Sequence, residues 1–230
     1  MKAKLIESHE IAPDVRHFTF EAADLAELGF VPGQFVSVTQ WIADKEIVRA
    51  YSIASEPDGG NRFALCLNRV ADGHLSPWLF DLTAGGEIDI KPPLGTFTLR
   101  PTGRDVLLVG TGTGVAPFRS ILRAELGKSE RKFTLLFGTR YETTILYGEE
   151  FGALAQKHSD QMRYWPTLSR GSESWSGRRG YVQNHLDEAI GERRDLDVMV
   201  CGLAPMVDQV RALLKGMGFE RRQIIVEKYD

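Results

Sequence analysis

The sequence is poor in cysteine and has almost no excess of either charge. Its two cysteines, Cys66 and Cys201, lie far apart and neither belongs to a C-x-x-C pair, which argues against a disulfide framework, a zinc site or an iron–sulfur cluster. The 28 Lys and Arg residues nearly balance the 31 Asp and Glu residues, which gives a net charge of -3. Nothing in this balance indicates nucleic acid or an anionic membrane as a partner.

Long apolar runs and several common catalytic signatures are also missing. No stretch approaches the ~20 apolar residues of a membrane span, and the polar start MKAKLIESHE does not resemble a secretory signal. The H-E-x-x-H and G-x-S-x-G motifs and any repeat period are absent, which disfavours the common metalloproteases, hydrolases and solenoids. We therefore expect a cytoplasmic globular protein without a bound metal; its oligomeric state is left open, with a monomer as one option.

The first hundred residues contain short runs of β-forming residues separated by turn signals. Pairs such as Pro32-Gly33 and Gly85-Gly86 separate the runs at the spacing typical of an antiparallel sandwich or small barrel. One short helix is expected at residues 75–81. The runs cover residues 15–20, 34–41, 48–54, 63–70 and 87–93.

After residue 103 the pattern changes to an apolar strand, a turn and then a helix, and this alternation repeats. Four or five such units predict a parallel sheet covered by helices on both faces. The boundary is expected in the turn at residues 100–104, which gives a first domain of residues 1–102 and a second of residues 103–230. The expected strands begin near residues 106, 133, 162, 197 and 224.

A glycine-rich turn, Gly110-Thr111-Gly112-Thr113-Gly114, follows the first strand of the second half and opens a helix. This is where a parallel sheet presents backbone N–H groups to phosphate. The third glycine of the strict G-x-G-x-x-G fingerprint is missing. From the turn alone, a dinucleotide site and an ordinary strand-to-helix turn both remain open.

Arginines follow the ends of the next two predicted strands. Arg140 stands close to where NAD-specific sites usually carry an acid, and Ser169 and Arg170 follow the third strand, with Arg178 shortly after. Arginines suit the 2'-phosphate of NADPH because guanidinium binds phosphate in a bidentate manner. The cluster therefore favours NADP(H) over NAD(H), although solvated loop arginines are the plain alternative.

Five ordered segments carry a resemblance to a known family. Arg49-Ala50-Tyr51-Ser52 resembles the R-x-Y-S flavin motif of the ferredoxin–NADP reductase family. Four further segments resemble, in order, its second flavin motif, its nucleotide turn, its nicotinamide-side dipeptide and its terminal acid-x-aromatic. The resemblance implies a six-stranded antiparallel β-barrel that holds FAD and a Rossmann-like α/β domain that binds NADP(H). These segments are residues 73–76, 110–118, 201–202 and 227–229.

The resemblance implies roles for the flavin-motif residues. Arg49 would neutralise the FAD pyrophosphate, and Tyr51, on the same strand face, would cover one side of the isoalloxazine ring. Ser52 would donate toward flavin N5. Ser76 lies at the start of the predicted short helix, whose N–H groups favour the second flavin phosphate. The expected flavin-binding residues are Arg49, Ala50, Tyr51, Ser52, Asn68, Gly73, Leu75 and Ser76.

The resemblance also implies roles near the end of the chain. Cys201 would pack beside nicotinamide C4, with Glu227 close enough to orient it, and Tyr229 would stack on the flavin face opposite Tyr51. The expected catalytic set is therefore Ser52, Cys201, Glu227 and Tyr229. The expected nucleotide-binding residues are Gly110, Thr111, Gly112, Thr113, Gly114, Arg140, Ser169, Arg170, Arg178, Cys201 and Gly202.

These expectations combine into a flavoprotein oxidoreductase that transfers hydride between NADPH and bound FAD and exchanges single electrons with ferredoxin or flavodoxin. One alternative is an NADH-dependent reductase component of an oxygenase system, or a free-flavin reductase, because residues 175–181 resemble segments of such enzymes. Another is a non-catalytic electron-transfer subunit of a larger complex, since a fold alone does not decide function.

Overall fold

The computed structural model describes residues 1–229, and the chain forms two compact units. The first unit comprises Met1–Leu99 and Ala116–Ala124, and the second comprises Arg100–Val115 and the chain from Glu125 onward. The division into domains after residue 102 stays a prediction. Within the described residues, no helix combines the length and the apolar character that a membrane crossing requires.

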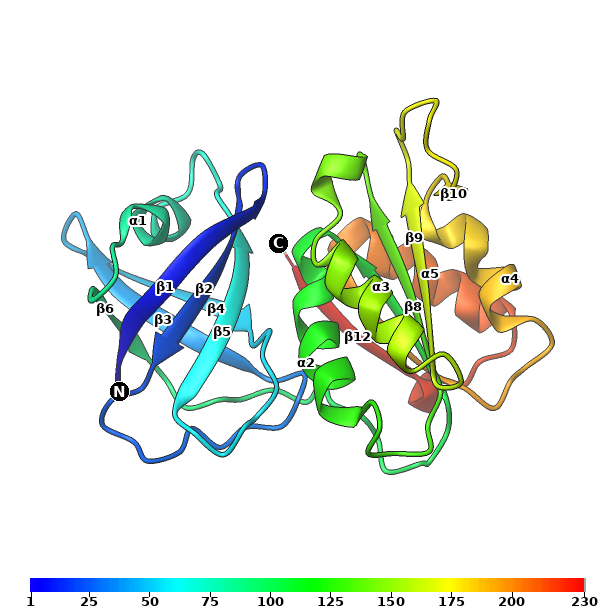
Figure 1. Cartoon of the computed structure of the whole chain (residues 1–230), viewed down its shortest axis with the longest axis horizontal. Helices are drawn as coiled ribbons and strands as arrows, with labels where there is room; N and C mark the ends of the chain where they lie inside the picture. Colours follow the sequence, from blue (N-terminus) through cyan, green and yellow to red (C-terminus); the bar gives the residue numbers. More distant parts are fainter. Residues whose placement is uncertain (230) are drawn as a thin grey trace. The chain divides into compact units, whose positions relative to one another are not determined.

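The first unit is built on a six-stranded antiparallel sheet that closes on itself (Figure 1). In the order β4-β3-β6-β1-β2-β5, β4 and β5 are the two ends of the sheet. An antiparallel bridge between Ile53 and Leu65 joins these ends, which confirms the predicted barrel. The strands are β1 (Lys2–Ala12), β2 (Val15–Glu21), β3 (Phe35–Ile42), β4 (Lys45–Ser52), β5 (Arg62–Asn68) and β6 (Glu87–Ile90).

Strand β1 was not among the strands predicted from the runs of β-forming residues, the first of which begins at residue 15. Its register against β2 shifts between Leu5 and Glu7 and again between Glu10 and Ala12. Each shift interrupts the strict alternation of buried and exposed side chains. The alternation that reveals a strand in the sequence is therefore broken twice within β1.

The barrel core combines aliphatic and phenylalanine side chains, and one short helix, α1 (Leu75–Asp81), packs against it. Leu75 and Leu79 lie one turn apart and are both buried, so this face of α1 packs into the core. Helix α1 spans the same residues, 75–81, that the sequence predicts as helical. The largest buried side chains of this core include Phe18, Phe20, Phe63, Ile53, Leu65 and Ile88.

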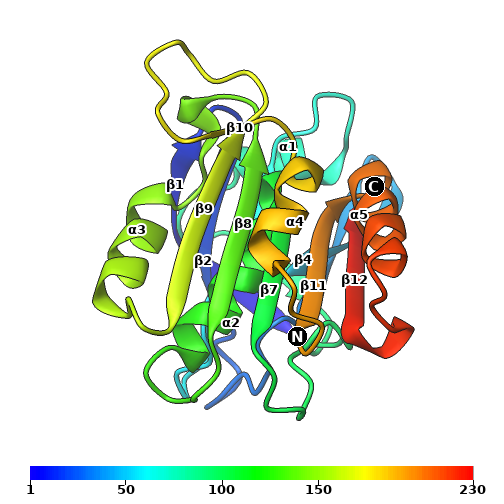
Figure 2. The same ribbon diagram turned by 90° about the vertical axis from the view of Figure 1, so that its right-hand side faces the viewer.

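The second unit is a six-stranded parallel sheet in the order β10-β9-β8-β7-β11-β12 (Figure 2). The predicted parallel architecture is confirmed, and the sheet has one strand more than the pattern indicated. That strand, β10, contains only two residues, too few for a periodic signal. The strands are β7 (Val106–Thr111), β8 (Phe133–Thr139), β9 (Met162–Leu168), β10 (Arg178–Arg179), β11 (Asp197–Leu203) and β12 (Ile224–Tyr229).

Helices cover both faces of this sheet, with α4 and α5 on one face and α3 on the other (Figure 2). Val207, Val210 and Leu214 of α5 pack on β-strand residues such as Val198 and Ile224. The remaining elements are α2 (Ala116–Glu125), α3 (Gly148–Lys157), α4 (Leu186–Ile190), α5 (Ala204–Gly216) and the 3-10 helices η1 (Gly112–Val115), η2 (Glu142–Thr144), η3 (Val182–His185) and η4 (Arg221–Gln223).

Most of α2 belongs to the first unit. Arg123 forms an ion pair with Glu56, with an Nη2–Oε1 distance of 2.7 Å, and Arg119 donates to the carbonyl of Ala54 at 2.8 Å. The ion pair holds the pKa of the Glu56 carboxyl below its usual value, first through the hydrogen bond from Arg123. These contacts fix α2 to the segment that follows β4.

Candidate functional site

Strand β4 presents the predicted flavin motif on the surface of the first unit. Arg49 and Tyr51 lie opposite Val38 and Val36 of β3 and share one face of the strand. Arg49 is exposed, and the one hydrogen bond recorded for its side chain goes from Nη1 to the carbonyl of Val48, at 2.8 Å. Its remaining donors fit an anionic ligand, because guanidinium carries five N–H groups.

Tyr51 combines an aromatic surface with a protonated hydroxyl. The side chain is half-buried and packs against the barrel core. Burial raises the pKa of Tyr51 to about 12, and the charge of Arg49 acts in the opposite direction. The hydroxyl therefore stays protonated at neutral pH. Ser52, next on the strand, is buried, whereas Ala50 is exposed.

The second predicted flavin segment lies between β5 and α1. Asn68 is exposed at the end of β5, and Ser76 Oγ accepts a hydrogen bond from the backbone of Val70 at 3.0 Å. Gly73 turns back toward Val70, whose carbonyl would lie 3.1 Å from a Cβ at this glycine. Leu75 places its side chain in the barrel core, so only its main chain is accessible to a ligand.

The first turn of α1 has no side-chain cap. His74 stands at the N-cap without a capping hydrogen bond, and no acidic residue lies in the first turn. Uncapped N–H groups and the helix dipole favour an anion such as phosphate. This arrangement therefore fits the predicted phosphate contact at Gly73 and Ser76.

In the second unit, the glycine-rich turn is built by η1 at the carboxyl end of β7. Gly110 and Thr111 end the strand, and Gly112 has a φ of +54° with nothing within 4 Å of a Cβ added there. The main chain at Gly112 is therefore open to an approaching ligand. Thr113 follows in the same turn of 3-10 helix.

Gly114 packs this turn onto the end of β11. A Cβ at Gly114 would lie 2.5 Å from the carbonyl oxygen of Cys201 and 2.9 Å from Cα of Gly202. Gly202 has a φ of +149°, and a Cβ there would lie 2.4 Å from Oγ1 of Thr111. The turn and the Cys201-Gly202 dipeptide therefore meet at one edge of the sheet, as the sequence predicts for the carboxyl ends of parallel strands.

Cys201 lies next to the acid and the aromatic expected to act with it. It pairs in register with Glu227 of β12, and its Sγ is 3.9 Å from Glu227 Oε1. Burial, and then the nearby Glu227 carboxylate, raise the pKa of the Cys201 thiol, while a side-chain hydrogen bond with Tyr229 lowers it. A fully buried, protonated thiol is a packing and hydrogen-bonding group, not a thiolate nucleophile.

Two of the predicted arginines are neighbours at the same carboxyl edge. Arg140 follows β8 and Arg170 follows β9, and the backbone N–H of Arg170 donates to the carbonyl of Arg140 at 2.9 Å. Both are exposed, and Arg170 Nη1 donates to the hydroxyl of Tyr141 at 3.3 Å. Ser169 directly precedes Arg170 and donates its backbone N–H to the carbonyl of Thr139 at 3.0 Å.

Arg178 has other partners. Its guanidinium pairs with Glu188 at 2.6 Å and lies 3.7 Å from the ring centroid of Trp165. The neighbouring Arg179 donates to the carbonyls of Gly171, Ser172 and Trp175. The contacts of Arg178 could not be read from the sequence, because Trp165 belongs to β9 and Glu188 to α4.

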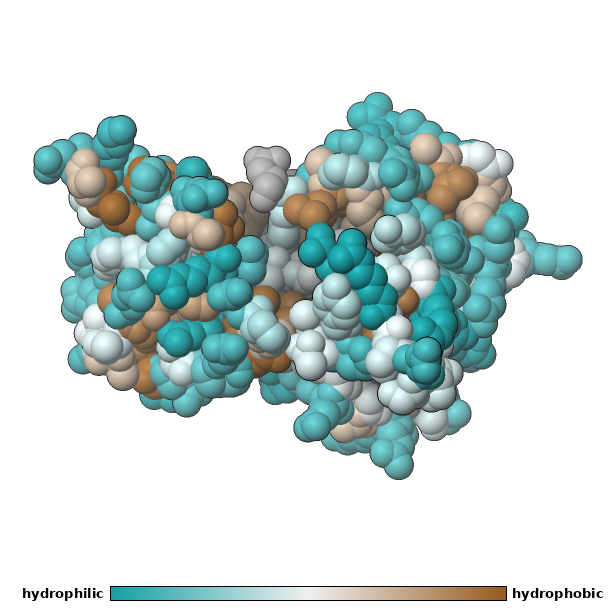
Figure 3. Space-filling view, turned by 90° about the horizontal axis from the view of Figure 1, so that it is seen from above, coloured by the Kyte–Doolittle hydropathy of each residue, from teal (hydrophilic) through white to brown (hydrophobic). Residues whose placement is uncertain are grey.

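The surface around the carboxyl ends of β8 and β9 suits a charged ligand. Seen from above, hydrophilic side chains cover much of this face of the second unit, with smaller apolar patches between them (Figure 3). Tyr141, with 42% of its surface exposed, was missed by the sequence analysis. The one sequence signal that could have indicated Tyr141 is its position directly after Arg140.

Comparisons with known proteins cover both units. An oxidoreductase FAD-binding domain profile matches residues 2–99, and an oxidoreductase NAD-binding domain profile matches residues 108–212. Ferredoxin–NADP reductase B of Sorangium cellulosum (strain So ce56) is 43% identical over 100% of this chain and 97% of its own length.

Two further similarities are weaker in sequence. NADH-cytochrome b5 reductase 1 of Mortierella alpina is 27% identical over 96% of this chain and 76% of its own length. The crystal structure of the cytochrome P450 reductase GcoB of Amycolatopsis is 29% identical with a TM-score of 0.89, over 99% of this chain and 69% of that one.

Proposed function

The chain belongs to the ferredoxin–NADP reductase family, and we propose that it transfers hydride between NADPH and a bound FAD and exchanges electrons with a ferredoxin or flavodoxin. It is an FAD-dependent oxidoreductase with a second binding domain for a pyridine nucleotide. The observation that carries the proposal is the close packing of the glycine-rich turn on Cys201-Gly202, which leaves Gly112 open at the carboxyl edge.

The first unit fits FAD through two side chains of β4 and the main chain at the start of α1. Arg49 supplies exposed donors for the pyrophosphate, Tyr51 supplies a ring face, and the uncapped start of α1 supplies N–H groups. Ser52 is proposed to donate toward flavin N5. A bound flavin supplies the conversion between two-electron hydride transfer and one-electron transfer to a carrier.

Residues of the second unit are proposed to position the nicotinamide. Cys201 keeps its proton and donates toward Glu227, which fixes the orientation of both side chains. Such positioning raises the rate by holding the reactants in the productive geometry. Tyr229, half-buried at the end of β12, is proposed to cover the flavin until the nicotinamide takes its place.

The preference for NADPH is proposed to rest on Arg140 and Arg170. The two arginines are exposed and adjacent at the carboxyl edge of the sheet, whereas Arg178 is paired with Glu188 and lies over Trp165. The guanidinium groups of Arg140 and Arg170 are available to bind a 2'-phosphate. Arg178 could bind one only after leaving Glu188 and Trp165.

An NADH-dependent reductase component of an oxygenase system is the second candidate. The engagement of Arg178 favours it, because one of the expected phosphate ligands is then neutralised. The similarity to a cytochrome P450 reductase points in the same direction. A protein electron carrier is common to both candidates, and a cytoplasmic location remains a prediction.

Steady-state kinetics of an Arg140→Gln/Arg170→Gln variant with NADPH and NADH test the choice. We expect the KM for NADPH to rise about 10- to 100-fold, as for the loss of two charge-assisted contacts, with little change for NADH. Arg178→Gln is the matched control and should affect both nucleotides alike. An equal effect of the double variant on both nucleotides would contradict the assignment.

A further inference from the structure

Four arginines line one pocket of the second unit, away from the glycine-rich turn. The pocket has a volume of about 570 Å³, within the size range of small-molecule sites. Ile224 and Val226 of the edge strand β12 supply its apolar lining. The arginines are Arg100, before β7; Arg211, in α5; and Arg221 and Arg222, in η4.

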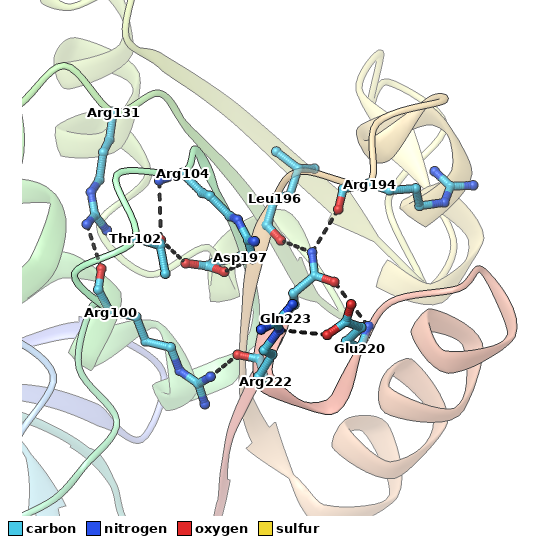
Figure 4. Close-up of polar contacts among 10 residues, drawn as sticks. All are labelled: Arg100, Thr102, Arg104, Arg131, Arg194, Leu196, Asp197, Glu220, Arg222 and Gln223. Atoms are coloured by element: carbon cyan, nitrogen blue, oxygen red, sulfur yellow. Dashed lines mark hydrogen bonds and ion pairs between the residues drawn. The ribbon is translucent and has the colours of Figure 1, made fainter.

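A buried glutamine, Gln223, anchors the turn that carries Arg221 and Arg222. Gln223 is 5% exposed, and its Nε2 donates to the carbonyls of Arg194 and Leu196, each at 2.8 Å (Figure 4). Its Oε1 accepts from the backbone of Glu220 at 3.1 Å. The side chain of Gln223 thus holds η4 in place through three hydrogen bonds, which fixes the main chain at Arg221 and Arg222.

Arg100 and Arg222 are also held in place. Arg100 Nη1 donates to the carbonyl of Arg222, and the carbonyl of Arg100 accepts from Arg131 Nη2 at 2.5 Å (Figure 4). Arg222 Nε pairs with Glu220 Oε2 at 2.6 Å. Glu220 is the single carboxylate recorded in contact with any of the four pocket arginines among residues 1–229.

Arg211 and Arg221 have no recorded hydrogen bond or ion pair with any other described residue. Arg211 is half-buried and Arg221 is exposed. Cations gathered around an apolar lining repel one another unless an anion joins them. The pocket therefore carries an excess of positive charge that the described part of the chain does not neutralise.

The pocket is distinct from the edge that carries the glycine-rich turn. Ile224 and Val226 pair with Val198 and Val200 of β11, which precede Cys201 in that strand. Arg221 and Arg222 come before β12 begins, so they lie beyond its amino end, whereas the turn lies at the carboxyl ends of the strands. A nucleotide bound at the turn does not account for these arginines.

We propose that this pocket binds a small phosphate-bearing anion with at least two negative charges. Guanidinium groups bind phosphate oxygens in a bidentate fashion, and Arg211 and Arg221 have donors available for such contacts. The apolar lining excludes water from one side of the anion, which strengthens the charge interaction. This binding goes beyond the proposed hydride transfer and does not depend on it.

The test is calorimetric titration of the FAD-loaded full chain with pyrophosphate in the absence of NADP+, which itself carries phosphate groups; the same titration of Arg140→Gln/Arg170→Gln shows which binding belongs to the nucleotide site. We expect one saturable site per chain. Arg211→Gln/Arg221→Gln should weaken binding at least about 10-fold, the loss expected for charge-assisted contacts, and each single variant should weaken it less. Lys128→Gln/Arg163→Gln, which removes two exposed charges elsewhere in the unit, should leave the affinity within about 2-fold.

A parallel titration with ADP distinguishes free pyrophosphate from a nucleotide-borne diphosphate as the source of the anion, and tighter binding of either one supports the site. Absence of saturable binding of both probes, or equal binding by wild type and the Arg211→Gln/Arg221→Gln variant, would overturn the proposal. A rise in KM for a protein electron carrier in that variant, with pyrophosphate binding unchanged, would also overturn it and assign the pocket to protein docking.

Discussion

The two units prepare for their ligands in different ways. In the first unit, side chains project from β4 and their removal leaves the strand ladder intact, as with the exposed Arg49. In the second, the main chain forms the glycine-rich turn, because Gly114 lies against the backbone of Cys201 and Gly202. Substitution should therefore weaken the first site by degrees and should disrupt the second as a unit.

The strongest test of this contrast is Gly114→Ala. The new Cβ of η1 would meet the backbone of Cys201 at 2.5 Å, and β11 cannot shift freely because it is hydrogen-bonded between β7 and β12. We expect a loss of about 2–3 kcal/mol in the free energy of unfolding, typical of overpacking, and a loss of nucleotide binding. Chemical denaturation and nucleotide titration measure the two effects.

Gly152→Ala is the matched control for this substitution. Gly152 lies within α3, and a Cβ there meets nothing within 4 Å, so alanine should stabilise the helix by about 0.5–1 kcal/mol. Unchanged stability and nucleotide affinity in Gly114→Ala would show that the turn does not pack on β11 as described.

Arg49→Ala should have a graded effect on the first unit. We expect FAD affinity to fall about 10- to 100-fold, which corresponds to about 1.4–2.8 kcal/mol, with little change in unfolding. The flavin-to-protein ratio from absorbance measures this. Lys45→Ala, which removes an exposed charge from the same strand, should retain FAD. Equal loss of flavin in both variants would show that FAD binding depends on the overall positive charge of the strand and not on Arg49 in particular.

The smallest expected effect concerns the ion pair between Arg123 and Glu56, which attaches α2 to the segment that follows β4. The Glu56 pKa is lowered by Arg123, so the ion pair stabilises the fold above the normal glutamate pKa and loses this effect as the pH falls through the lowered value. Since the two side chains are 28% and 35% exposed, Glu56→Gln should cost at most about 1 kcal/mol at pH 7.

Denaturation of wild type and Glu56→Gln across a range of pH checks this expectation. The difference between them should shrink below about pH 4.5, the region in which an ordinary glutamate becomes protonated. Glu46→Gln removes an exposed acid from β4 and serves as the control. A difference that grows toward acidic pH would have the wrong sign for this ion pair.

Local patterns predicted what depends on local chemistry. The glycine-rich turn, the extent of α1 and the parallel sheet all follow from residues that are close in sequence. Strand β1 was missed because register shifts break its alternation. The pairing of Arg178 with Glu188 and Trp165 joins separate elements, and the arginine pocket gathers residues from before β7, from α5 and from η4. Such contacts depend on tertiary packing, which a single sequence does not encode in any short pattern.

Anaerobic mixing of the purified protein with NADPH, followed by the absorbance of its flavin, tests hydride transfer from the nucleotide to the bound FAD. We expect one FAD per chain and rapid loss of the oxidised flavin absorbance, with NADPH effective at lower concentration than NADH. A protein that takes up no FAD on reconstitution, or a bound flavin that neither nucleotide reduces, would contradict this expectation.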